Sequence, residues 1–262
     1  MIEFPNINPI ALDLGLIKIR WYAIAYLAGI LFSWALILKI ISIKKINLNS
    51  EIISELISNI IIGIILGGRL GYILFYNIEY FLDNFIEIFK IWNGGMSFHG
   101  GLIGVIIAVI YTAKKYDAKL MLLADLVAIS APIGIFFGRL ANFINGELYG
   151  RITNHYFGII FPNGGNLPRH PSQLYEAFFE GFLLFLILLT LLQFKKVLEK
   201  NGLLCGLFIS LYGIFRFFIE FVREPDAHIG LLYLNFTMGQ LLCLPMLIIG
   251  IFFIINSYRR FF

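Results

Sequence analysis

The sequence predicts an all-α, polytopic integral membrane protein, and three observations support this fold class. Hydrophobic residues make up 60% of the chain and charged residues only 14%. The mean hydropathy is +0.87, which is far from the composition of a soluble domain. A helix needs roughly 20 mostly apolar residues to cross a bilayer, and about seven segments qualify. They lie near residues 17–38, 52–76, 97–113, 120–143, 172–194, 202–222 and 235–256. We therefore expect a single membrane-embedded domain over residues 1–262.

The positive residues between these segments predict the orientation of the chain. Clusters follow the first, third, fifth and seventh segments, and short cytoplasmic loops are enriched in Lys and Arg. We therefore expect the N-terminus outside and the C-terminus in the cytoplasm, although Lys18 and Arg20 flank the first segment on its outer side. That segment is too long, too late and too poor in a cleavage site for a signal peptide, so we interpret it as a retained span. The clusters are Lys39, Lys44 and Lys45; Lys114, Lys115 and Lys119; Lys195, Lys196 and Lys200; and Arg259 and Arg260.

Several function classes are disfavoured by the same composition. The net charge of +4 does not indicate nucleic acid, because the positive residues are accounted for by the cytoplasmic loops. Cys205 and Cys243 both fall inside predicted spans, which favours small packing residues over a disulfide or a metal pair. No Cys or His spacing resembles a zinc site, and the chain has no phosphate loop of the nucleotide-binding kind.

Two longer connections lie on the predicted outer side. The stretch 77–96 carries acidic residues, an Asn-Gly-Gly turn and aromatic residues spaced as if they lay at the membrane interface. The stretch 144–171 contains three prolines and several glycines. We expect this second stretch to form a small, loop-rich extracytoplasmic cap over the outer ends of the helices.

The outer end of the fourth segment is unusually polar for a spanning helix, and polar groups at membrane depth usually serve a function. Arg139 and Asn142 are three residues apart and share a helix face. The planar fork of an arginine suits the oxygens of an anionic phosphate group. The alternative is a snorkelling arginine with nearby glycines for helix packing. The cluster with Asn145, Glu147 and Arg151 favours a site.

Two carboxylates repeat at helical spacing in the fifth segment, at Glu176 and Glu180. They are expected to face the bundle interior, because carboxylates facing lipid would be intolerable. Two roles stay open at this point. The carboxylates steer arginines or bind substrate, or they are structural partners of Arg69 or Arg216.

The sixth segment carries Arg216 and Glu220 four residues apart, a spacing that predicts an ion pair with a structural role. Arg223 follows at the outer end, just before a proline ends the helix. We expect it to be free to reach the same anionic group as Arg139.

His99 opens the third segment between residues that suit close helix packing. A lone histidine near a helix N-terminus is more often structural than catalytic. The functional interpretation is favoured because His99, Arg139 and Arg223 all fall at the outer ends of their segments.

Seven motifs are spread over almost the full length of the chain. They are Arg20-Trp-Tyr, Leu66-Gly-Gly-Arg-Leu-Gly-Tyr, Gly94-Gly-Met-Ser-Phe-His-Gly-Gly-Leu-Ile-Gly, the run from Gly138 to Arg151, Arg169-His-Pro-Ser-Gln-Leu-Tyr-Glu, Glu220-Phe-Val-Arg-Glu-Pro-Asp and Met238-Gly-Gln. Together they resemble the motifs of the bacterial prolipoprotein diacylglyceryl transferase family. Two features depart from the family pattern: Ala141 stands where glycine is usual, and the connection 152–168 is short.

The resemblance implies a transferase of the bacterial inner membrane. It would move the diacylglyceryl group of phosphatidylglycerol to the lipobox cysteine thiol of a prolipoprotein signal peptide, forming a thioether and releasing glycerol phosphate without a metal or soluble cofactor. The resemblance assigns Arg139 and Arg223 to the lipid phosphate and adds Arg69 as a further substrate-binding residue. Around the reacting centre it implies His99, Tyr22, Asn142, Glu147 and Gly150.

This chemistry agrees with the residues, because a thiol is a weak nucleophile until it is deprotonated and arginines stabilise charge that grows on a departing phosphate. A polytopic anion transporter is the main alternative. The polar groups gather on the outer side, however, whereas a transporter needs a path through both halves. Another phospholipid-processing enzyme, with water as acceptor, stays open.

Overall fold

The computed structural model is mostly helical and describes residues 2–5, 7–15, 18–194, 196–225, 230, 232 and 235–259. Within these residues, six helices are long and apolar enough to cross a membrane, judged by length and composition. They are α1 (Trp21–Ile43), α2 (Ser50–Tyr76), α4 (Phe98–Lys115), α5 (Leu120–Ile144), the continuous helix Ser172–Leu191 and α9 (Met238–Arg259). The prediction of an all-α polytopic membrane protein is confirmed. Lys195, Asp226 and Arg260, named above, lie outside the described residues.

The seventh expected segment is shorter than the other six. It is the apolar helix α8 (Leu203–Ile219) of 17 residues, where we expected a span over 202–222. Glu220 caps its C-terminus, and the chain then turns. The apolar run continues past the helix end because Phe221 and Val222 are apolar without being helical, so hydropathy alone overestimates the length.

The helix Ser172–Leu191 is not regular. It consists of α6 (Ser172–Glu176), a π-helical segment η3 (Ala177–Leu183) and α7 (Leu184–Leu191). Within η3, Gly181 lies against α5, where an added Cβ would stand 2.7 Å from the Cβ of Phe136. The π-helical segment therefore packs directly on α5, one turn before Arg139.

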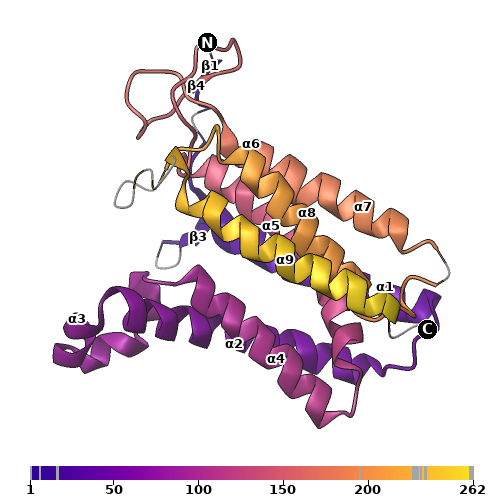
Figure 1. Ribbon diagram of the computed structural model, residues 1–262. Helices are drawn as coiled ribbons and strands as arrows, with labels where there is room; N and C mark the ends of the chain where they lie inside the picture. The colour runs from indigo at the N-terminus through magenta and orange to yellow at the C-terminus, as the bar shows by residue number, and fades with distance from the viewer. Residues whose placement is uncertain are drawn as a thin grey trace. The chain divides into compact units, whose positions relative to one another are not determined.

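The chain divides into two compact units, which we describe separately: Ile37–Ala124, and Met1–Leu36 together with Asp125–Phe262. In the Ile37–Ala124 unit, α2 and α4 run side by side (Figure 1). Their contact is lined with glycine. An added Cβ on Gly63 would lie 2.5 Å from the carbonyl oxygen of Gly104, and one on Gly67 would overlap that of Gly100. Small residues let membrane helices approach this closely.

Three short helices connect α2 to α4, namely α3 (Ile78–Asp83), η1 (Phe85–Phe89) and η2 (Ile91–Asn93). They occupy the stretch that we expected at the membrane interface. Phe85, Phe89 and Trp92 are strongly exposed there. Exposed aromatic side chains are typical of the boundary between lipid and water.

In the other unit α8 packs along α9 and also lies beside α6 and α7 (Figure 1). Asp125 of α5 is fully buried and accepts hydrogen bonds from the backbone nitrogens of Gly202 at 2.7 Å and Cys205 at 2.8 Å. These nitrogens belong to the start of α8, where a helix leaves its N–H groups unpaired and favours negative charge. Asp125 thus fixes the N-terminal end of α8 against α5.

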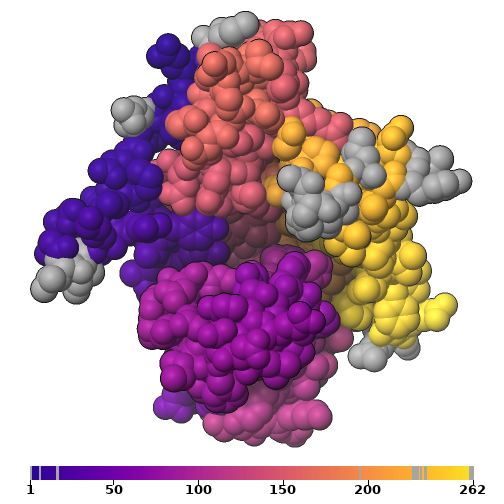
Figure 2. Space-filling model, turned by 90° about the vertical axis from the view of Figure 1, so that its left-hand side faces the viewer, coloured from indigo at the N-terminus to yellow at the C-terminus, as the bar shows by residue number. Residues whose placement is uncertain are grey.

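The cap segment 144–171 is mostly irregular, as expected, and it incorporates the N-terminus. Strand β1 (Ile2–Glu3) pairs in parallel with β4 (Ile159–Ile160), and β2 (Ile10–Asp13) pairs antiparallel with β3 (Lys18–Arg20). Figure 2 shows the indigo N-terminal residues against the pink and salmon cap. We did not predict these strands, because two to four residues are too few to show an alternating pattern.

Candidate functional site

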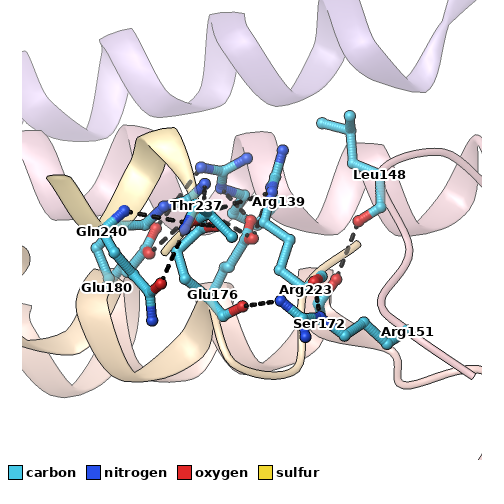
Figure 3. A network of polar contacts seen from close by, with 11 residues as sticks. Arg139, Leu148, Arg151, Ser172, Glu176, Glu180, Arg223, Thr237 and Gln240 are labelled. Carbon is cyan, nitrogen blue, oxygen red and sulfur yellow. Dashed lines mark hydrogen bonds and ion pairs between the residues drawn. The ribbon is translucent and has the colours of Figure 1, made fainter. Parts of the chain in front are cut away.

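A cluster of three arginines and three glutamates joins α5, α6, η3 and the C-terminal end of α8 with the turn after it. We call it the arginine–glutamate cluster, and Figure 3 shows its core. Its members are Arg139, Glu176, Glu180, Arg216, Glu220 and Arg223. The formal charges of the six side chains cancel. The arginine side chains retain 12% to 20% exposure, whereas Glu176 and Glu180 have none.

Glu176 is the centre of this cluster. Its Oε2 lies 2.8 Å from Arg139 Nε, and its Oε1 lies 2.8 Å from Arg223 Nη1 and 3.1 Å from Arg216 Nη1. One carboxylate therefore holds three guanidinium groups that come from distant parts of the sequence. Such a buried charge is tolerable only because it is so fully paired.

Glu180 lies one helical turn beyond Glu176, in the π-helical segment. It is 3.6 Å from Arg139 Nη2 and 3.7 Å from Arg216 Nη1. Neither of its carboxylate oxygens has a hydrogen-bond partner among the described residues. Glu180 is thus buried as deeply as Glu176 but held much more loosely.

The expected ion pair between Arg216 and Glu220 is present. Glu220 also accepts a hydrogen bond from Thr237 Oγ1 at 2.7 Å. Gly239 makes room for it, because an added Cβ would lie 2.6 Å from the Glu220 carboxyl carbon. Gln240 in turn accepts a hydrogen bond from the Thr237 backbone. The Met238-Gly-Gln stretch therefore shapes the wall around Glu220, a role that the sequence alone did not reveal.

Arg223 differs from our expectation. We expected it to be free, but it contacts Glu176 and lies 3.7 Å from Glu220. The reason is that the chain turns directly after α8, which directs this side chain back toward the carboxylates. Of the two roles left open for Glu176 and Glu180, the structure shows the pairing with arginines, including Arg216.

A second polar group adjoins Arg139 on the next turn of α5. Asn142 is buried, and its Nδ2 donates to the Tyr22 hydroxyl at 3.2 Å and to Glu147 Oε1 at 2.9 Å. The structure thus brings together three predicted site residues from α1, α5 and the start of the cap. Glu147 itself is exposed.

The turn that carries Glu147 is held by residues that we had not singled out for this role. Gln173 Nε2 donates to the carbonyl oxygen of Glu147 at 2.6 Å, and Ser172 Oγ donates to that of Leu148 at 3.0 Å. Leu148 has a positive φ of 57°, a rare conformation for a residue with a side chain. The polar start of α6 was the available signal, because two buried polar residues need partners.

Gly150 joins the cap to the turn after α8. It forms a bridge with Arg223, and its nitrogen donates to the carbonyl oxygen of His170 at 2.8 Å. A Cβ there would overlap the carbonyl oxygen of Val222, so only glycine fits. The adjacent Arg151 donates through Nε to the Arg223 carbonyl oxygen at 2.9 Å.

Arg69 lies in the Ile37–Ala124 unit and is 5% exposed. Its guanidinium is surrounded by backbone carbonyl oxygens and stacks on the Phe81 ring at 5.0 Å. The N–H groups of Arg69 donate to these oxygens and thereby fix the connection between α2 and α4. The accepting residues are Glu87, Ile88, Lys90, Gly94 and Gly95.

His99 also lies in the Ile37–Ala124 unit, whereas the other predicted site residues apart from Arg69 lie in the larger unit. It is exposed in the first turn of α4, beside Phe98. Ser97 caps this helix by accepting a hydrogen bond from the Gly100 nitrogen at 3.3 Å. The cap fixes the backbone at His99 and leaves its ring accessible.

In the larger unit the guanidinium groups bind carboxylate oxygens, and the same donors are able to bind other anions. Arg139 and Arg223 meet at one carboxylate, and a phosphate group of similar size and charge suits the same donors. Within the described residues, no group of three or more His, Cys, Asp or Glu side chains is arranged to hold a metal ion.

A family model described as prolipoprotein diacylglyceryl transferase matches residues 9–256. A protein of Rickettsia akari is 52% identical over 254 residues, which cover 97% of this chain and 98% of the relative. A protein of Rickettsia canadensis is 51% identical over 247 residues, covering 94% and 95%, and one of Rickettsia bellii is 50% identical over 257 residues, covering 98% of both chains. All three are named phosphatidylglycerol–prolipoprotein diacylglyceryl transferase.

Proposed function

Because this chain belongs to the prolipoprotein diacylglyceryl transferase family, we propose that its arginine–glutamate cluster binds the phosphate of phosphatidylglycerol during transfer. The protein is a multi-pass membrane transferase that moves the diacylglyceryl group from phosphatidylglycerol to a prolipoprotein, the first step of lipoprotein maturation. The observation that carries the proposal is the meeting of Arg139 and Arg223 at Glu176.

The reaction needs charge stabilisation on the phosphate. The sulfur of the lipobox cysteine in the signal peptide attacks the glyceryl carbon, a carbon–sulfur bond forms, and the carbon–oxygen bond to the phosphate breaks. Glycerol phosphate leaves with the bonding electron pair. Arg139 and Arg223 face the growing negative charge, and one such preorganised donor is worth roughly 3 kcal/mol.

The neighbouring polar group orients the lipid in this proposal. Tyr22, Asn142 and Glu147 form a connected set of hydrogen-bonding groups next to Arg139. The glycerol headgroup carries hydroxyls, which such donors and acceptors recognise. Gly150 keeps the cap close to Arg223. We assign proton removal from the thiol to His99, because its exposed imidazole can accept a proton.

The role that we propose for Arg69 is indirect. We retain it as a contributor to substrate binding, acting through the backbone that it holds. Its carbonyl partners include Gly94 and Gly95, which immediately precede the first turn of α4. In this way it positions the segment that carries His99.

The orientation is also a proposal. The lysine and arginine clusters favour an extracytoplasmic cap and N-terminus with a cytoplasmic C-terminus, in the bacterial inner membrane. The pairing of β1 with β4 supports one part of this, because it ties the N-terminus to the cap segment 144–171. Both must then lie on the same side of the membrane.

A product assay tests the function. Purified protein in phosphatidylglycerol vesicles should release glycerol phosphate only when a peptide with a lipobox cysteine is added. Arg139→Ala should abolish release, whereas Lys18→Ala, at an exposed position of β3, should not. Release without the peptide would indicate water as acceptor, and transport of a labelled anion without lipid turnover would refute the proposal.

A further inference from the structure

We propose that Glu180 takes up a proton when a phosphodiester headgroup binds to the arginines of the cluster, so that lipid binding is coupled to protonation of a buried carboxylate. This inference rests on the proposed function and specifies how the phosphate is accommodated. Glu180 acts as a charge-balancing residue behind the site, because it contacts the arginines and not the lipid.

The first support is the burial of Glu180 without hydrogen bonds. Its side chain has 0% exposure, and both oxygens lack a hydrogen-bond partner among the described residues. An ionised carboxylate in such a place depends entirely on nearby positive charge. Its two arginine contacts, at 3.6 and 3.7 Å, are long for ion pairs.

The second support is the charge balance. Arg139, Arg216 and Arg223 balance three glutamates when no lipid is bound. A phosphodiester brings one further negative charge and draws the arginines toward itself. A buried cluster with an excess negative charge is costly. One proton on a glutamate restores neutrality.

The third support is that Glu180 has the weakest ion pairs and hydrogen bonds of the three glutamates. Glu176 has three contacts between 2.8 and 3.1 Å. Glu220 is paired with Arg216 and hydrogen-bonded by Thr237. A proton on either would break stronger interactions than a proton on Glu180.

Apart from Glu176, the described groups that face Glu180 offer no other proton acceptor. Arg139 faces it from α5, Arg216 and Tyr212 from α8, Glu176 from α6, and Cys243 from α9, with Arg223 nearby. Arginine stays charged, and tyrosine and cysteine side chains are ordinarily neutral near pH 7. They have no site for an added proton there.

The local backbone supports a special role for this position. Glu180 lies in the π-helical segment Ala177–Leu183, and π-bulges occur frequently at functional sites. Gly181 packs against Phe136 of α5, which holds Glu180 beside Arg139. The irregular helix thus places a loosely bonded carboxylate behind the predicted phosphate position.

Calorimetry measures the number of protons that the protein takes up when lipid binds. Short-chain phosphatidylglycerol is titrated into the detergent-solubilised protein in two buffers of different ionisation enthalpy. The lipid is a phosphodiester, which stays a monoanion throughout, so any proton taken up goes to the protein. We expect net proton uptake by the wild type, and an affinity that falls as pH rises, by at most about tenfold per pH unit for one proton.

Matched variants identify the residue. Glu180→Gln keeps the size of the side chain and its neutral form, and we expect it to bind lipid with no proton uptake and no pH dependence between about pH 6 and 9. Glu224→Gln removes an exposed carboxylate paired with Arg169 and should behave like the wild type. If Glu180→Gln does not fold, Glu180→Asp is the substitute and should retain uptake.

The outcomes separate the two proposals. Lipid binding by the wild type without proton uptake would overturn the inference, as would unchanged uptake in Glu180→Gln. Absence of lipid binding by the wild type, or equal binding by Arg139→Ala, would instead refute the phosphate site itself.

Discussion

Arg139 contacts Glu176 through its Nε nitrogen, which lies 2.8 Å from a carboxylate oxygen. This side-on contact uses the part of the guanidinium nearest to the chain. The terminal nitrogen Nη2 lies 3.6 Å from Glu180. The arginine is thus held at one edge and offers the other edge to a ligand.

Arg139→Lys should lose activity by about 100-fold or more although the charge is kept. An ammonium group has no Nε donor and cannot hold Glu176 and grip phosphate oxygens at the same time. Turnover of phosphatidylglycerol measures the loss, and thermal unfolding in detergent checks the fold. Arg223→Lys should show a weaker loss. Near-wild-type turnover by Arg139→Lys would show that a bidentate grip of Arg139 on the phosphate is not needed.

His99→Gln should lose activity in a pH-dependent manner. If His99 removes the thiol proton, the loss shrinks as pH rises and the thiol ionises by itself. Transfer to a lipobox peptide is measured for both proteins between about pH 6 and 9. A constant ratio across this range would leave His99 as a positioning residue.

The cap should become less stable in mild acid because of His170. Burial, and to a smaller extent the nearby His155, lower the pKa of His170 from its ordinary value of 6.5. Below pH 6.5 the unfolded chain therefore binds a proton more readily than the folded protein, so stability falls as pH decreases toward the lowered pKa.

His155→Gln, which removes the charge repulsion, should lessen that loss, and His170→Gln should remove this contribution. Limited proteolysis of the cap at several pH values provides the measurement. Identical acid sensitivity of the wild type and His170→Gln would contradict the assignment.

Gly100→Ala should destabilise the α2–α4 pair, whereas Gly101→Ala should be neutral. A Cβ at Gly100 would overlap the carbonyl oxygen of Gly67, while one at Gly101 would meet nothing closer than 3.8 Å. Overpacking of this kind costs typically about 1–3 kcal/mol. Thermal unfolding in detergent compares the two variants, and equal stabilities would show that the helices separate easily.

Cysteine labelling should place Lys114 and Asn154 on opposite sides of the membrane. Both residues are exposed. Lys114 is preferable to Lys115, which is paired with Glu55 at 2.7 Å. In a background with Cys205 and Cys243 replaced by serine, an impermeant reagent outside intact cells should label Asn154→Cys and not Lys114→Cys. Labelling of Lys114→Cys would overturn the topology.

The helices and the location of the polar stretch could be predicted from sequence because the relevant forces are local. Backbone groups in a bilayer must be satisfied within the same helix, so a run of apolar residues specifies a span without knowledge of its neighbours. The i, i+4 pair of Arg216 and Glu220 is equally local. The motif from Gly138 to Arg151 was recognisable for the same reason, since its residues are contiguous.

Only the tertiary structure decided which distant charges meet. Glu176 gathers arginines from positions 139, 216 and 223, and the five carbonyl partners of Arg69 come from the connection 87–95. The pairing of β1 with β4 and the π-helical position of Glu180 were likewise invisible in the sequence. The physical reason is that a buried charge takes whatever partner the packing brings within a few ångströms, and composition and spacing do not encode that distance.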